Sequence, residues 1–102
     1  MSKYRLNKYR LRVIVVSPEN QQNKAAYELL FTFVYDPEQY GNGHYASIRG
    51  ANFWHQVIDL RYDAEFDRND KAAWVEKWAR NYWSGENGAF MVKELDIQEE
   101  TE

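Results

Sequence analysis

Residues 69–83 read NDKAAWVEKWARNYW and carry the clearest secondary-structure signal in the chain. Apolar side chains recur in this stretch at the spacing of one helix face: Trp74, Val75, Trp78, Ala79 and Tyr82. The spacing predicts an amphipathic helix over residues 70–83, and it leaves Trp83 outside the apolar stripe. Asn69 or Asp70 is suited to cap the first turn, because a short polar side chain there accepts from the free backbone amides.

Four other segments have the apolar–polar alternation, or the β-branched and aromatic content, that is typical of strands. They are residues 8–16, 26–35, 53–62 and 89–97. A helix over residues 18–30 is an alternative to a loop followed by the second strand. Gly41, Gly43 and Gly50 indicate that the longest irregular stretch lies between the second and third strands.

This element order predicts an α+β fold, in which one helix packs on one face of a small, mostly antiparallel sheet of about four strands in β-β-β-α-β order. A chain of 102 residues is long enough for one core. We expect a single domain over residues 1–97 and a disordered acidic tail over 98–102. If the first and last strands are neighbours, their opposite charges help to set the register: Lys8, Arg10 and Arg12 on one, Glu94 and Asp96 on the other.

Composition narrows the class of protein. The chain has no cysteine, which excludes disulfides and thiolate metal sites. It shows no signal peptide and no apolar run of membrane-spanning length, so we expect a cytoplasmic protein that does not enter a membrane. A net charge of −3 and a pI near 5.4 argue against a general electrostatic footprint for nucleic acid.

Catalytic and metal-binding signals are weak. His44 and His55 are the two histidines, and an enzymatic site would need their rings to meet beside a carboxylate such as Asp59. Acidic and amide side chains between residues 63 and 69 occupy positions 1, 3, 5 and 7 of a calcium loop, but Arg68 replaces the glycine at position 6. We therefore expect no cofactor and no metal, and a small enzyme with a histidine–carboxylate site is a minor alternative.

Interaction with another protein is the function that the sequence favours. One helix covers one sheet face, which leaves the other face for a partner or for a second copy of the chain. The apolar residues expected on that uncovered face are Ile14, Val16, Leu30 and Val34. The acidic and aromatic residues expected to bind the partner are Asp63, Glu65, Asp67, Trp83 and Tyr40.

Single-stranded nucleic acid is the alternative ligand. The N-terminal strand combines rings that can stack on bases with cations that can neutralise phosphates. The residues expected to form this surface are Tyr4, Lys8, Tyr9, Arg10 and Arg12.

Overall fold

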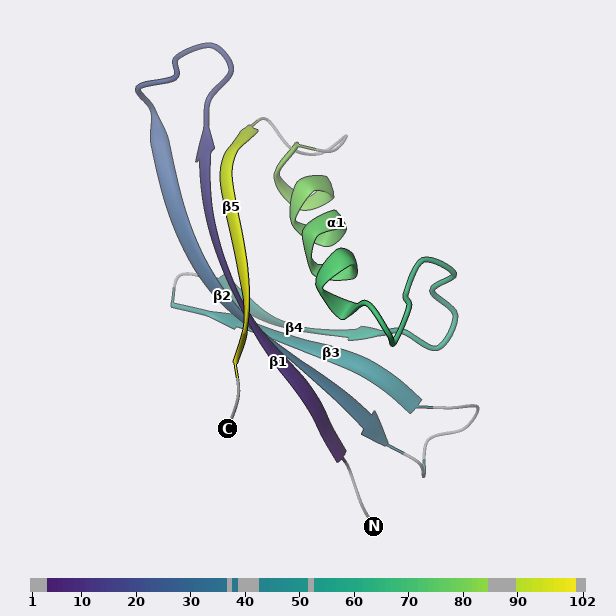
Figure 1. The fold of residues 1–102 in the computed structure, drawn as a ribbon. Coiled ribbons are helices and arrows are strands. Elements are labelled where there is room, and N and C mark those ends of the chain that lie inside the picture. Colours follow the sequence, from purple (N-terminus) through teal and green to yellow (C-terminus); the bar gives the residue numbers. More distant parts are fainter. Residues whose placement is uncertain (1–3, 37, 39–42, 52, 85–89, 101–102) are drawn as a thin grey trace.

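The computed structural model describes residues 4–36, 38, 43–51, 53–84 and 90–100, with the backbone alone for residues 4–6. The elements in chain order are β1 (Tyr4–Val16), β2 (Lys24–Asp36), β3 (Gly43–Gly50), β4 (Phe53–Asp59), α1 (Lys71–Ser84) and β5 (Met91–Glu100). Within these residues five strands form one antiparallel sheet in the order β4-β3-β2-β1-β5. Figure 1 shows α1 against one face of this sheet. The predicted α+β class is confirmed, with one strand more than expected.

The additional strand is β3, which occupies much of the stretch predicted to be irregular. Its residues alternate between buried positions, such as Ala46 and Ile48, and outward positions, such as Ser47. Gly50, the last residue of β3, is closely approached by β2: a Cβ there would lie 2.4 Å from Leu29 Cδ2. Gly43 and Gly50 were interpreted as parts of a loop, whereas they are the first and last residues of β3. Gly41 lies outside the described residues.

Two other boundaries differ from the sequence prediction. The alternative helix over residues 18–30 is wrong, because β2 begins at Lys24 and pairs with β1 along its length. β5 continues three residues past Ile97, and the acidic residues there pair with the basic end of β1. The residues expected to begin a tail thus lie in the sheet as far as Glu100, where Lys8 is the paired position.

The core lies between α1 and the inner face of the sheet. Its largest fully buried side chains include Leu11, Phe31, Phe33 and Ile48. α1 approaches β5 and β1 most closely, so one half of the sheet lies directly under the helix and the other half is reached by long aromatic side chains. Asp70 caps α1 as predicted, since its carboxylate accepts from the amide of Ala73 at 3.1 Å.

Two adjacent rows of the helix have different environments. Lys71, Val75, Ala79 and Trp83 follow one another at four-residue spacing, and all four are buried. The neighbouring row, Trp74, Trp78 and Tyr82, becomes progressively more exposed, and Tyr82 has 47% of its surface in solvent. The predicted stripe was therefore centred on the wrong row: Tyr82 is not a core residue, whereas Trp83 is buried and only 4% exposed.

The outer face of the sheet is more polar than expected. Of the four apolar residues assigned to it, Val16 and Val34 are buried, while Ile14 and Leu30 are half-buried. The first and last strands are neighbours, which was the condition for the expected charge pairing, and Arg12 lies opposite Asp96. Ion pairs between charged side chains lie across β2, β1 and β5 on the outer face, so this part of the face is not a continuous apolar surface.

α1 is 14 residues long. In the described part of the chain, no helix combines the length and the apolar character needed to cross a bilayer.

Candidate interaction groove

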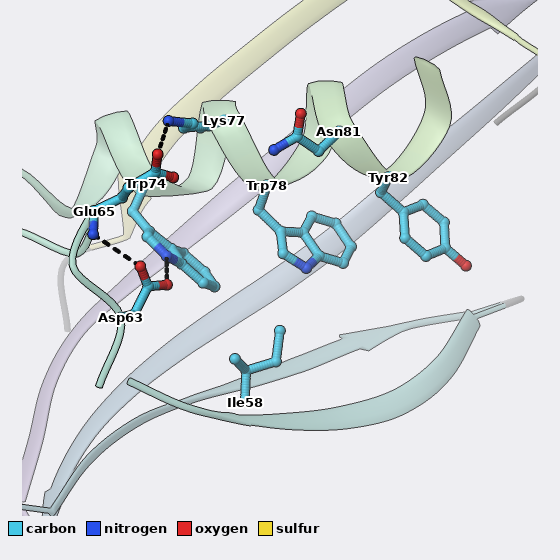
Figure 2. Close-up of a pocket in the computed structure, with 8 residues that line it drawn as sticks. All are labelled: Ile58, Asp63, Glu65, Trp74, Lys77, Trp78, Asn81 and Tyr82. Atoms are coloured by element: carbon cyan, nitrogen blue, oxygen red, sulfur yellow. Dashed lines mark hydrogen bonds and ion pairs between the residues drawn. The ribbon is translucent and has the colours of Figure 1, made fainter. Parts of the chain in front are cut away.

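A groove of about 330 Å³ opens between α1 and β4, where the helix lies away from the sheet edge (Figure 2). We call it the α1–β4 groove. Its lining residues come from the helix, from β4 and from the connector between them: Ile58, Asp63, Glu65, Trp74, Lys77, Trp78, Asn81 and Tyr82. The groove therefore brings two of the predicted partner-binding residues, Asp63 and Glu65, beside three aromatic side chains of α1.

The aromatic wall is the less buried row of the helix. Figure 2 shows the side chains of Trp74, Trp78 and Tyr82 projecting from α1 toward Ile58 on β4. Trp78 and Tyr82 stack with ring centroids 5.0 Å apart and planes inclined by 13°. Trp78 packs edge-to-face against the buried ring of Phe31, with ring centroids 5.2 Å apart. The wall is consequently a supported aromatic surface with one exposed member, Tyr82.

The polar end of the groove has a fixed carboxylate and an exchangeable ion pair. Asp63 accepts from the indole Nε1 of Trp74 at 2.9 Å and from the amide of Glu65 at 2.9 Å, so both of its oxygens hold the local structure. Glu65 instead pairs with Lys77 at 2.5 Å, and more than half of each side chain is exposed. An exposed pair of this kind contributes little to stability, so Glu65 can change partner at small cost.

The spacing of acidic residues in this part of the chain has a structural cause. Asp59, Asp63 and Asp67 each accept from the backbone amide two residues later, at 2.8–2.9 Å. These are Asx turns, which reverse the chain between β4 and α1. Within the described residues no group of three or more metal-ligand side chains comes together. The calcium-like spacing is thus explained by turns.

The remaining predicted partner-binding residues do not lie in the groove. Asp67 lines an adjacent depression together with His44 and Arg68, and this depression shares Asp63 with the groove. Trp83 was expected to be exposed, and this is wrong: its ring packs on Tyr27, with centroids 5.3 Å apart, because its row of α1 faces the sheet. Tyr40 lies outside the described residues. Sequence reasoning missed Tyr82, which it had assigned to the core.

The two histidines lie on opposite faces of the sheet. His44 is on the inner face between the rings of Tyr35 and Phe66, and burial lowers its pKa below the ordinary value of 6.5. His55 is on the outer face, where its Nε2 is 2.9 Å from Ser47 Oγ. Asp59, the carboxylate considered for this site, is bound by Arg61 instead. The histidine–carboxylate site is therefore not assembled.

The basic N-terminal strand is largely neutralised within the fold. Arg10 pairs with Glu28 and Glu100, and Arg12 pairs with Glu28 at 3.1 Å. The bond from Arg10 is the main reason that the pKa of Glu28 is lowered. Tyr9 points inward, edge-on to Phe33 at 5.8 Å, so its ring is not presented to a ligand.

The other two residues of the predicted nucleic-acid surface are Lys8 and Tyr4. Lys8 lines a hollow of the outer face. The side chain of Tyr4 lies outside the described part of the chain.

No family model matches this chain, and neither a curated protein nor a solved structure resembles it significantly.

Proposed function

We propose that this protein is an interaction domain that binds a segment of a partner protein in the α1–β4 groove. The observation that carries the proposal is the exposed edge of the stacked Trp78–Tyr82 pair, which lines the same groove as the charged pair Glu65–Lys77 near Trp74 (Figure 2). Aromatic side chains on a rigid support, bordered by polar groups, are typical of the energetically important parts of protein interfaces.

The size of the groove limits the occupant. Its volume of about 330 Å³ is at the low end of ligand pockets, which span roughly 300–1,000 Å³. It therefore accommodates a few side chains of a segment and not a folded domain. Ile58 on β4 and Trp78 on α1 form opposite sides of its apolar part, as Figure 2 shows. An aliphatic or aromatic side chain is the anchor that this part would bury.

The acidic side chains of the groove favour a basic residue on the incoming segment. Glu65 lies at the end of the groove, and its present partner Lys77 is exposed. A basic side chain on the incoming segment would compete for the same carboxylate, whereas an acidic one would meet Glu65 and Asp63 together. The preferred segment thus has an apolar anchor with a lysine or arginine close to it in sequence.

The test begins with selection of peptides from a displayed random library on the immobilised protein. Enriched peptides should share the apolar anchor and the nearby basic residue. A synthetic peptide of the enriched sequence should bind Tyr82→Ala at least about tenfold more weakly than the wild type, since an aromatic anchor of an interface contributes about 2 kcal/mol or more. Glu65→Gln should reduce the preference for the basic residue.

Tyr62→Ala is the matched control. Tyr62 is a more exposed tyrosine that does not line the groove, and its replacement should leave peptide affinity unchanged. Equal loss in both variants, or no enriched peptide, would contradict the proposal. If solution mass rises with concentration and Tyr82→Ala abolishes the rise, the occupant is a second copy of the chain and the proposed foreign segment is wrong.

A further inference from the structure

A second concave site lies on the outer face of the sheet, away from α1. This outer-face hollow has a volume of about 620 Å³, and three aliphatic side chains contribute to its lining. The polar side chains that line it come from four neighbouring strands: Lys8, Thr32, Tyr45, Ser47, Arg49 and His55. Every one of these six has a hydrogen-bond donor.

The charge of the hollow is opposite in sign to that of the whole chain. Lys8 and Arg49 line it, and none of the described lining residues is acidic. Two acidic side chains of the outer face, Glu28 and Asp59, are engaged by Arg10 and Arg61. The hollow is therefore a local cationic site on a protein of net charge −3.

The strands place these groups in an ordered row. Tyr45, Ser47 and Arg49 alternate with the buried residues of β3, so their side chains project on the same face at intervals of about 7 Å. Ser47 is fixed by its bond to His55 on β4. The ring of Tyr45 and the guanidinium of Arg49 thus lie four residues apart on one strand, on the face of the sheet that α1 does not cover.

We propose that the outer-face hollow binds single-stranded nucleic acid, with a phosphate on Arg49 and a base on Tyr45. A guanidinium binds phosphate oxygens through two parallel hydrogen bonds, and a tyrosine ring stacks on any unpaired base. An open sheet face with an aromatic residue suits a single strand, because bases in a duplex are already stacked and paired. This surface shares Lys8 with the predicted N-terminal surface but does not use Arg10 and Arg12, which are paired within the fold. It is also independent of the α1–β4 groove.

The experiment is a titration of the protein into a fluorescently labelled oligothymidine of about 12 nucleotides at low salt, followed by anisotropy. With one phosphate on Arg49, the logarithm of the binding constant should fall with the logarithm of salt at a slope of about −0.7. Arg49→Gln should reduce the magnitude of the slope by about 0.7, and Tyr45→Ala should weaken binding about fivefold or more.

Arg80→Gln is the matched control, because it removes the same charge from an exposed arginine of α1 that pairs with Glu76. It should leave the affinity and the slope close to those of the wild type. Far-UV circular dichroism should show that each variant is folded.

Three results would overturn the proposal. One is the absence of binding at about 100 μM protein in about 20 mM salt. Another is equal weakening by Arg49→Gln and Arg80→Gln. The third is full displacement of the oligonucleotide by an equal concentration of inorganic phosphate, which would make the hollow a simple anion site.

Discussion

Replacing Trp83 by alanine is the most direct test of how α1 is oriented in the core. The side chain is 4% exposed and packs against Tyr27, Trp78 and Phe53, with ring centroids 5.3, 5.9 and 6.5 Å away. A buried tryptophan removes about 150–250 Å² from water, which at about 25 cal/mol per Å² is roughly 4–6 kcal/mol. Alanine retains a small part of this area. We therefore expect Trp83→Ala to lower the free energy of unfolding by about 3–5 kcal/mol.

The assay is urea unfolding followed by far-UV circular dichroism, because loss of a tryptophan changes the fluorescence signal itself. Tyr82→Ala is the comparison, since Tyr82 is the next residue on α1 and is 47% exposed. With about half of its area buried, its loss should cost about 1–2 kcal/mol. An unfolding free energy of Trp83→Ala within about 1.5 kcal/mol of the wild type, at an unchanged urea dependence, would refute the assignment of Trp83 to the core.

Two further predictions concern β3. Gly50→Ala should destabilise the protein by about 1–3 kcal/mol, because the new Cβ would lie 2.9 Å from the backbone oxygen of Glu28 as well as against Leu29; thermal unfolding measures this, and an unchanged midpoint would contradict it. The pKa of His44 is lowered by burial and by Arg68, so the unfolded state takes up its proton first as pH falls below 6.5. The unfolding free energy should accordingly decline between pH 7 and about pH 5, and His44→Gln should remove part of that decline; parallel pH profiles would show that His44 does not contribute.

Period-2 alternation located most of the sheet from sequence alone. It found β1, β4 and β5 because each has one face that must be apolar to cover the core. Ala46 and Ile48 of β3 also alternate with outward-facing residues, but the sequence prediction considered only the glycines of this stretch and made it irregular. Gly50 is needed because Leu29 approaches closely, but a glycine can equally mark a loop, and sequence alone does not distinguish the two.

The pairing of charges was partly predictable. The opposite charges of the first and last strands were expected to help set the register if these strands are neighbours, and β1 and β5 do pair, with Arg12 opposite Asp96. The ion pairs of Arg10 and Arg12 with Glu28 on β2 were not expected. Cross-strand partners depend on register, which is a property of the assembled sheet.

The candidate groove was predictable only in its parts. Asp63, Glu65 and the aromatic residues of the helix were each identified from sequence, but their meeting in one groove depends on where α1 lies over the sheet. The rotation of the helix about its own axis is fixed by tertiary packing and not by its periodicity. The apolar side of α1 contains two adjacent rows of residues, one ending in Trp83 and the other in Tyr82. The periodicity alone does not say which row faces the core.

The same rotation of α1 gives Trp83 and Tyr82 opposite roles. Burial of Trp83 is accompanied by burial of the charged first member of its row, Lys71. Lys71 is 8% exposed, and its ammonium group donates to Asn7 Oδ1 at 2.8 Å and to the backbone oxygen of Arg68 at 3.1 Å. Since a buried ammonium group is tolerated only with such partners, these bonds are part of what makes this rotation stable. The cost of burying Lys71 is thereby linked to the exposure of Tyr82, the residue on which the proposed interaction depends.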